Sequence, residues 1–185
     1  MTDLKAIDQS WTLFLDRDGV INQETVGDYI TAWKDFRFYE GVKEALKIFA
    51  FRFGRVIVIT NQRGVSKGLM TENDLLDIHK NMVEAIAAAG GRIDRIYYCL
   101  DMHNDSPNRK PNPGMGYMAK RDFPEIDFAK TLMIGNTIGD MQFGKNIGAQ
   151  TIFIPSNRPA PGLPDPYTDA VYPSLIAVAE EMAGI

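Results

Sequence analysis

The sequence predicts an α/β fold in which helices cover both faces of a parallel sheet, a three-layer arrangement of the Rossmann type without a cap domain. Strand-like apolar runs alternate with helix-like segments along most of the 185 residues, which is the pattern of a sheet built from strand-helix-strand units. Polar residues gather directly after the predicted strands, at the edge where open parallel sheets bind ligands. The intervals between these polar stretches leave no room for a lid domain, so we expect a single domain over residues 1–185.

Short runs of strand-forming apolar residues predict the strands, and the longer segments between them predict the helices. The strands are expected at 12–15, 55–59, 94–98, 131–134 and 151–154. The helices are expected at 41–52, 72–89, 114–121, 139–147 and 174–183. The second helix has the clearest ends, because Thr71 can cap its first turn, Asp74 sits three residues on, and Gly90-Gly91 follows its last turn.

Two further segments have a composition that restricts their structure. Asn112-Pro113 has the form of a cap followed by a proline at the first helical position, so we expect a helix to begin there. Residues 155–168 are too rich in proline for a helix or a central strand. We expect them to form a long surface connection that leads to a short strand near 170–172 and a closing helix.

Net charge and cysteine content exclude several classes of protein. A formal net charge of −4 argues against an extended nucleic-acid surface, which needs a basic face. No apolar run approaches the roughly 18 residues that span a bilayer, and residues 1–8 lack the features of a secretory signal. Cys99 is the only cysteine, which is typical of a reducing cytoplasm. We therefore expect a cytoplasmic monomer that acts on a small molecule and binds neither nucleic acid nor membranes.

Two carboxylates follow the first predicted strand, in the stretch Leu13-Phe-Leu-Asp-Arg-Asp-Gly-Val-Ile-Asn22. Residues i and i+2 of an extended segment point to the same side, so Asp16 and Asp18 are expected to converge while Arg17 points away. Two acids held together are unfavourable unless a cation or a shared proton accompanies them. The pair predicts one or both of these; the alternative is that the two acids only end a strand and cap a turn.

Three other polar stretches follow later strands, namely Thr60-Asn-Gln-Arg63, Arg109-Lys-Pro111 and Gly135-Asn-Thr-Ile-Gly-Asp140. Because the carboxyl ends of parallel strands meet at one edge of a sheet, we expect these stretches and the two acids to line a single crevice. The crevice should stay open, shaded only by the loops at 23–38 and 100–108.

These motifs resemble the haloacid dehalogenase superfamily of phosphotransferases, over residues 12 to 150. Within it, Asp16-Arg-Asp-Gly-Val-Ile-Asn22, Thr60-Asn-Gln-Arg-Gly-Val-Ser-Lys-Gly68 and Arg109-Lys-Pro-Asn-Pro-Gly-Met115 look like the capless branch of sugar bisphosphate and histidinol-phosphate phosphatases. The resemblance implies a Mg²⁺-dependent phosphomonoesterase that works through an aspartyl phosphate. Its expected substrate is a small phosphorylated sugar, most readily D,D-heptose 1,7-bisphosphate, with histidinol phosphate as the alternative.

The resemblance also implies roles for the acids. Asp16 is the expected nucleophile, and Asp18 the expected acid and base, with Asp16 ionised and Asp18 protonated at first. The expected magnesium ligands are a carboxylate oxygen of Asp16, the backbone carbonyl of Asp18 and the side chain of Asn136.

Positive and polar groups are expected around the transferring phosphate. By resemblance, phosphate binding is assigned to Thr60, Asn61 and Lys110, and substrate recognition to Arg109. The opposite wall of the crevice is expected from two segments, Glu24 through Gly27 and Gln62-Arg63.

Two departures from the family pattern bear on metal binding. Family members commonly carry a zinc loop of three cysteines and a histidine, whereas here Cys99 and His103 are accompanied by Ser106 and Asn108. We therefore expect no zinc, and a 100–108 loop held by hydrogen bonds and Pro107.

The fourth motif usually begins Gly-Asp, but this chain has Gly135-Asn136. The loss of one negative ligand should weaken magnesium binding, and a sugar-phosphate-binding protein that has lost most turnover is therefore a rival interpretation. Asp140 either compensates through a bound water or caps a helix. His79 and His103 are expected to be ordinary surface histidines.

Overall fold

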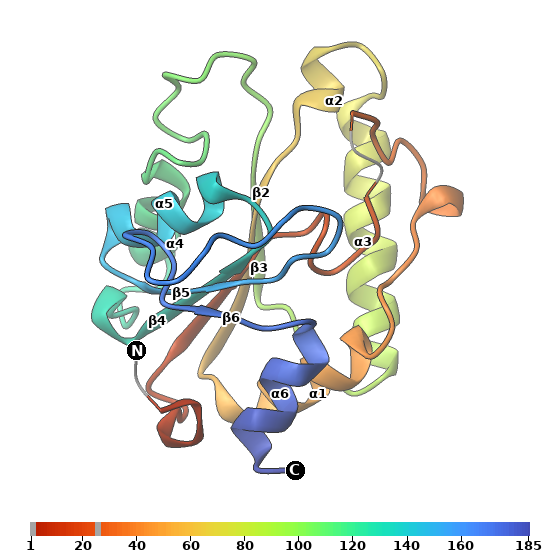
Figure 1. The fold of residues 1–185 in the computed structure, drawn as a ribbon. Helices are drawn as coiled ribbons and strands as arrows, with labels where there is room; N and C mark the ends of the chain where they lie inside the picture. The colour runs from red at the N-terminus through yellow and green to blue at the C-terminus, as the bar shows by residue number, and fades with distance from the viewer. Residues whose placement is uncertain (1–2, 25–26) are drawn as a thin grey trace.

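Six parallel strands form one sheet in the computed structural model, which describes residues 3–24 and 27–185 (Figure 1). The strands lie in the order β3-β2-β1-β4-β5-β6. Their bounds are β1 Thr12–Leu15, β2 Arg55–Asn61, β3 Arg95–Cys99, β4 Thr131–Gly135, β5 Gln150–Phe153 and β6 Ala170–Val171. All five pairings are parallel, as the alternating sequence pattern predicts.

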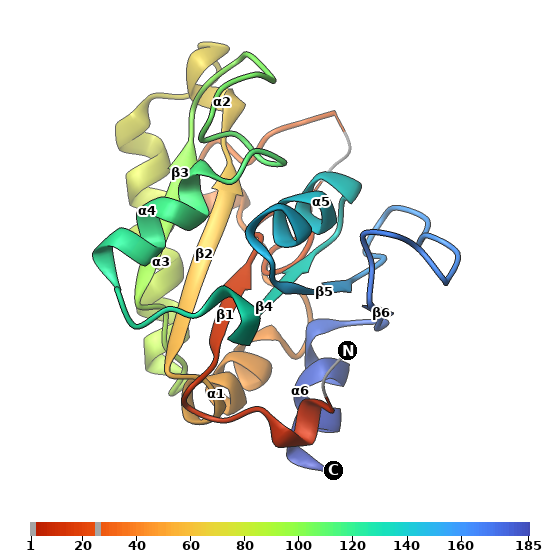
Figure 2. The same ribbon diagram turned by 90° about the vertical axis from the view of Figure 1, so that its left-hand side faces the viewer.

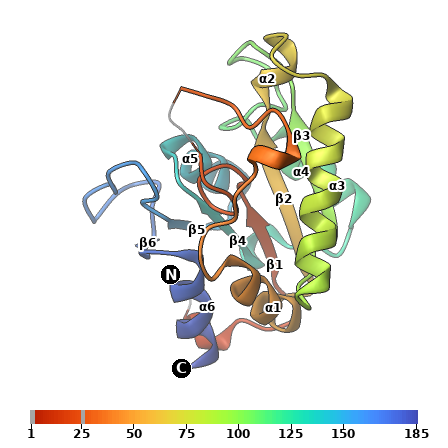
Figure 3. The same ribbon diagram turned by 90° about the vertical axis from the view of Figure 1, so that its right-hand side faces the viewer.

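Helices cover both faces of this sheet, which confirms the three-layer prediction (Figures 2 and 3). One face carries α1 Val42–Arg52, α3 Glu72–Ala88 and α6 Leu175–Ala183, and the other carries α4 Gly114–Asp122 and α5 Ile138–Ile147. The short helix α2, Arg63–Ser66, and three 3-10 turns, η1 Leu4–Ala6, η2 Trp33–Asp35 and η3 Phe128–Lys130, complete the described elements. None of the described helices has the length and apolar character that a bilayer crossing requires.

The central strand β1 shows how one apolar run serves two cores. Leu13 and Leu15 pack into the cluster under α1, α3 and α6, while Phe14 packs into the cluster under α4 and α5. Successive side chains of a strand point to opposite faces, so a strand covered on both sides must be apolar throughout. All four residues of β1 are buried.

Helix ends follow the capping signals in two places and depart from them in one. Thr71 and Asp74 form the expected capping box at the start of α3. A second capping box, from Thr137 and Asp140, starts α5. The predicted cap at Asn112 is wrong, because α4 begins at Gly114 and the Asn112 amide instead donates to the carbonyls of Asn104 and Ser106.

The strand order determines where the site lies. Strand β1 has β2 on one side and β4 on the other, so the chain reverses its direction of travel across the sheet at this point. Open parallel sheets bind ligands at such a switch, outside the carboxyl ends of the strands. The residues after β1, β2 and β4 are therefore neighbours.

Helix α5 is held against the sheet by a glycine, and this contact is testable. A Cβ at Gly144 would lie 2.5 Å from Thr151 Cγ2 and 3.1 Å from Met133 Cβ. We expect Gly144→Ala to lower the free energy of unfolding by about 1–3 kcal/mol through overpacking, as measured by urea denaturation. Gly139→Ala on the same helix is the control, since its Cβ would meet only Thr137 Oγ1, at 3.6 Å, and equal losses in both variants would contradict the interpretation.

Candidate active site

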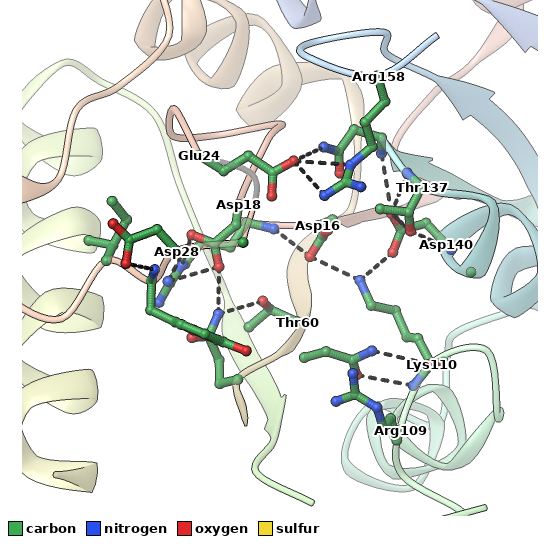
Figure 4. Close-up of a pocket in the computed structure, with 18 residues that line it drawn as sticks. Asp16, Asp18, Glu24, Asp28, Thr60, Arg109, Lys110, Thr137, Asp140 and Arg158 are labelled. Carbon is green, nitrogen blue, oxygen red and sulfur yellow. Dashed lines mark hydrogen bonds and ion pairs between the residues drawn. The ribbon is translucent and has the colours of Figure 1, made fainter. Parts of the chain in front are cut away.

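A cavity of about 360 Å³ opens at the carboxyl edge of the sheet, where the sequence predicts the crevice. It is lined by all four polar stretches and by part of the loop at 23–38 (Figure 4). Its volume suits a small metabolite. The predicted site residues that line it are Asp16, Asp18, Glu24, Gly27, Thr60, Asn61, Gln62, Arg109, Lys110 and Asn136.

Asp16 stands directly after β1, with its side chain in the cavity. Its backbone N–H continues the ladder to Ile134 O at 3.0 Å, which fixes the residue to the sheet. Its Oδ1 accepts from Lys110 Nζ at 2.9 Å and from Arg17 N at 2.8 Å. Among the described residues both partners bond to Oδ1, so Oδ2 is left for an incoming group.

Lys110 is buried between two carboxylates. Its ammonium lies 2.9 Å from Asp16 Oδ1 and 2.6 Å from Asp140 Oδ1, and it donates to Ile59 O at 2.7 Å. Burial alone would lower the pKa of Lys110. The charges of Asp140 and Asp16 raise that pKa by more than burial lowers it, so the pKa lies above the ordinary value for a lysine. Because an ammonium has three donors, Lys110 reaches a phosphate only by exchanging one of these partners.

Arg17 does not point away from the two acids, so that prediction is wrong. The extended geometry ends at Leu15, and Arg17 turns inward and is 1% exposed. Its guanidinium donates to both oxygens of Asp18, with Nη2 at 2.8 Å from Oδ1 and 2.9 Å from Oδ2. The alternation rule fails here because it holds only while the backbone stays extended.

Asp18 is surrounded by donors. Beyond Arg17, Oδ1 accepts from Asn22 Nδ2 at 2.9 Å and Oδ2 accepts from Gln62 Nε2 at 2.7 Å. Burial raises the pKa of Asp18, but Arg17, Asn22 and Gln62 together lower it below the ordinary value. Asp18 is thus ionised in this arrangement.

The two acids have different electrostatic environments. Burial raises the pKa of the Asp16 carboxyl to about 7, with the charge of Asp140 adding to the effect and Lys110 opposing it. The lowered pKa of Asp18 differs from the expectation of a protonated Asp18, whereas a pKa of about 7 leaves Asp16 partly ionised at neutral pH. A bound dication would reverse the balance at Asp16, because a nearby positive charge favours the carboxylate.

His79 is not a surface histidine, which corrects a second expectation. It is 5% exposed on α3, and its Nε2 lies 3.1 Å from Arg17 Nη1. A guanidinium only donates, so Nε2 accepts and the imidazole is neutral. The burial of His79 could have been predicted from the helical periodicity, because His79 lies on the same face of α3 as the buried residues Leu75 and Met82.

The residues at the end of β2 support one another. Thr60 and Asn61 lie inside the strand rather than after it. Thr60 Oγ1 accepts from Gln62 Nε2 at 2.9 Å, which leaves the hydroxyl proton free to donate into the cavity. The Asn61 side chain exchanges two hydrogen bonds with the backbone of Lys110, each 3.1 Å long, and so positions Lys110, while the residue itself also lines the cavity.

Asn136 lies fully buried at the end of β4 and bonds to a residue far away in sequence. Its Nδ2 donates to Glu24 Oε1 at 2.8 Å and to Ser156 Oγ at 3.1 Å. Gly19 packs beneath it, where a Cβ would lie 1.9 Å from Nδ2. Because Gly19 also has a φ of +86°, only glycine fits this position without strain.

Arg158 is a site residue that the sequence did not reveal. It comes from the proline-rich connection at 155–168, which was expected to lie only on the surface, yet it lines the cavity. Its Nη2 lies 3.1 Å from Glu24 Oε1. No local pattern marks it, because the contact joins two loops distant in sequence.

Asp140 takes part in capping α5, one of its two expected roles, although it does so from the third helical position and not as the N-cap itself. Thr137 is the N-cap of α5 and Asp140 is the third helical residue. Its Oδ2 accepts from the backbone N–H groups of Asn136 and Thr137, at 3.2 and 3.0 Å, while Oδ1 faces Lys110. One carboxylate therefore starts the helix and holds the lysine.

Of the two arginines predicted to contact the substrate, one lines the cavity and the other does not. Arg109 lines the cavity, but Arg63 does not, because its guanidinium bonds to Asn104 in the 100–108 loop. That loop itself contributes nothing to the cavity lining. Of the predicted wall from Glu24 to Gly27, the residues at 25 and 26 lie outside the described part of the chain.

The oxygen atoms that face the cavity fit a magnesium ion. Asn136 Oδ1 is buried and has no hydrogen-bond partner among the described residues, a costly arrangement for a carbonyl unless something binds it. Magnesium prefers oxygen ligands and keeps several waters. The ligands that the family resemblance implies, namely a carboxylate oxygen of Asp16, the backbone carbonyl of Asp18 and the side chain of Asn136, are all oxygen donors of this kind.

Comparison with known families gives a match over most of the chain. A family model described as polynucleotide kinase 3 phosphatase matches residues 12–153. A D-glycero-alpha-D-manno-heptose-1,7-bisphosphate 7-phosphatase of Mycobacterium bovis is 36% identical over 142 residues, covering 75% of this chain and 74% of the relative. An enzyme of the same name from Campylobacter jejuni is 34% identical, covering 77% and 80%.

Solved structures show the same architecture. The D,D-heptose 1,7-bisphosphate phosphatase from B. bronchiseptica, complexed with magnesium and phosphate, has a TM-score of 0.84 at 29% identity and covers 94% of this chain and 98% of that chain. The phosphatase of the same name from Burkholderia thailandensis has a TM-score of 0.68 at 29% identity, with 95% and 99% covered.

The buried histidine predicts a pH dependence of stability. Burial and the charge of Arg17 lower the pKa of His79 to about 3, whereas the unfolded value is about 6.5. Below pH 6.5 the unfolded state binds a proton that the folded state does not, so the free energy of unfolding falls as the pH falls. We expect His79→Gln to reduce this loss, as measured by urea denaturation of magnesium-free protein at pH 7.5 and 5.

His103→Gln is the matched control, because His103 is exposed in the 100–108 loop. It should keep the pH dependence of the wild type. A parallel pH dependence of the wild type and His79→Gln would contradict the neutral, buried state of His79.

Proposed function

Because this chain belongs to the polynucleotide kinase 3 phosphatase family, within the haloacid dehalogenase superfamily, we propose that it is a Mg²⁺-dependent phosphomonoesterase for a small sugar phosphate. D,D-heptose 1,7-bisphosphate is the proposed substrate. The observation that carries the proposal is the Asp16 carboxylate, which faces a cavity with one oxygen held by Lys110 and the other without a protein partner among the described residues.

This geometry supports a two-step reaction through Asp16. In the first step Oδ2 of Asp16 forms a bond to phosphorus, the bond between phosphorus and the sugar oxygen breaks, and the leaving oxygen takes a proton from Asp18. In the second step water attacks phosphorus and gives a proton to Asp18, which frees phosphate and restores Asp16.

Asp18 needs a proton for the first step, although it is ionised in the cavity without substrate. An arriving phosphate dianion raises the pKa of a neighbouring carboxylate by like-charge repulsion, so substrate binding itself favours the protonated form. Arg17, Asn22 and Gln62 then stabilise the anion that remains after the proton has left.

Positive charge supports the same chemistry. Lys110 holds Asp16 and lies beside the position of the transferring group, and the Thr60 hydroxyl can donate to a phosphate oxygen. When bound, Mg²⁺ offsets the repulsion between the phosphate and the attacking carboxylate. Asp16, Asn136 and the Asp18 carbonyl are the proposed ligands, and zinc is not expected.

The net charge of the chain and the size of the cavity favour a small metabolite over a polynucleotide. The chain carries a net charge of −4, whereas a nucleic-acid surface is basic. The relatives named above are phosphatases of a heptose bisphosphate. Arg109 and Arg158 both line the cavity and are the groups proposed to bind the second phosphate or sugar hydroxyls. A single-domain, monomeric and cytoplasmic enzyme is part of this proposal.

The nucleophile is tested by Asp16→Asn. We expect hydrolysis to fall by about 10³-fold or more, with affinity for the sugar phosphate nearly retained, because the amide keeps the shape of the side chain and loses its nucleophilic charge. Phosphate release and ligand binding are measured on the same protein. Asp105→Asn, on the exposed 100–108 loop, is the control, and substantial turnover by Asp16→Asn would exclude the covalent mechanism.

The substrate is tested by phosphate release from a panel with and without Mg²⁺. The panel contains heptose 1,7-bisphosphate, histidinol phosphate and an oligonucleotide with a 3′-phosphate. We expect the highest kcat/KM for the bisphosphate and little release without Mg²⁺. Preference for histidinol phosphate or the oligonucleotide would replace the proposed substrate, and no release from any compound would favour a binding protein.

A further inference from the structure

We infer that Glu24 supplies the carboxylate that the magnesium site lacks at position 136. It does so by holding the amide of Asn136 and by placing its own negative charge beside that amide. The inference rests on the proposed function for the identity of the cation. It assigns Glu24 to the metal side of the cavity rather than to the substrate wall.

The orientation of Asn136 follows from the chemistry of its partners. A carboxylate only accepts hydrogen bonds, so the group 2.8 Å from Glu24 Oε1 must be the amide nitrogen. Ser156 Oγ accepts from the same nitrogen, at 3.1 Å. Since the amide is planar, its oxygen lies on the other side, where it is buried and unpartnered among the described residues. Glu24 thereby leaves Asn136 Oδ1 free for a cation.

Glu24 is itself held in place by the loop at 155–168. Arg158 contacts Glu24 Oε1 through Nη2 at 3.1 Å and Nε at 3.2 Å (Figure 4). Asn157 Nδ2 also donates to the Glu24 carbonyl, at 3.0 Å. The Glu24 side chain is 16% exposed and that of Arg158 is 37% exposed. The Glu24 carboxylate is thus less exposed to solvent than the guanidinium that pairs with it, and its charge is less screened by salt.

The charge count of the site explains why such a group matters. With Asn at position 136, the Asp16 carboxylate is the only proposed ligating group that is itself charged, since Asp18 would bind through its neutral carbonyl, and cation affinity depends on the number of charged ligands. A hydrogen-bonded carboxylate behind a ligand also orients that ligand and increases its electron density. Glu24 provides both effects through one contact.

The test measures Mg²⁺ affinity of substrate-free protein by isothermal titration calorimetry, without reference to turnover. We expect Glu24→Gln to weaken Mg²⁺ binding by about 10- to 100-fold. Asp28→Asn is the matched control, because it removes the same charge from the cavity lining without a contact to Asn136. Unchanged Mg²⁺ affinity in Glu24→Gln would overturn the inference.

Exchanging the two groups gives the sharper experiment. Asn136→Asp alone puts two carboxylates within hydrogen-bond distance, so its thermal midpoint without Mg²⁺ should fall and should rise strongly when Mg²⁺ is added. In the double variant Glu24→Gln, Asn136→Asp the glutamine donates to the aspartate, which restores the hydrogen bond and the charge with the roles exchanged. We expect this variant to regain the Mg²⁺ affinity of the wild type.

Failure of the double variant to bind Mg²⁺ better than Glu24→Gln would also overturn the inference, provided that circular dichroism shows it folded. The Mg²⁺ affinities test the role of Glu24 separately from the phosphate-release assay, which tests the proposed function. If the wild type releases no phosphate from any substrate but the affinities follow this pattern, the role of Glu24 stands and the enzymatic proposal fails. If Glu24→Gln alters only KM for the sugar phosphate, Glu24 belongs to the substrate wall.

Discussion

The ammonium of Lys110 is the contact on which the site depends. It lies within 2.9 Å of Asp16 and 2.6 Å of Asp140 and also bonds to the backbone of β2. Without it, two carboxylates would face each other in a buried space, which is strongly unfavourable. Asn61 fixes the backbone of Lys110 by two hydrogen bonds. The lysine therefore joins the ends of β1 and β2 to the start of α5, and the cavity forms around it.

The two acids after β1 illustrate how neighbouring residues acquire different chemistry. Asp16 stays on the sheet and is balanced by Lys110, whereas Asp18 turns away and is balanced by Arg17. Arg17 is one residue from each acid in sequence. Its guanidinium, which pairs with Asp18, also forms a hydrogen bond with His79 on α3. A short motif is thus completed by a helix residue that no local spacing relates to it.

The fold was largely predictable because its causes are local. A strand such as β1 is buried on both faces and must be a continuous apolar run, and the end of such a run marks the ligand edge. The position of Thr60, at the end of β2, and that of Asn136, directly after β4, were predictable from the strands, and that of Lys110 from the motif at 109–111. The contacts of Arg17 and His79 were not, because they depend on a turn and on tertiary burial. Arg158 was missed for a similar reason. The proline content of its loop excludes a helix or a central strand, but it does not predict which part of the protein the loop contacts.

Asp140 contributes to the candidate site and to the start of α5 with one side chain. The same carboxylate starts α5 and neutralises Lys110, so any replacement at that position damages the helix and the charge balance at once. Position 136 is different, because its side chain makes no capping contact and its neighbour Glu24 offers a second source of charge. An uncharged residue at position 136 therefore leaves the capping box of α5 and the ion pair of Lys110 intact, whereas an uncharged residue at position 140 would remove both.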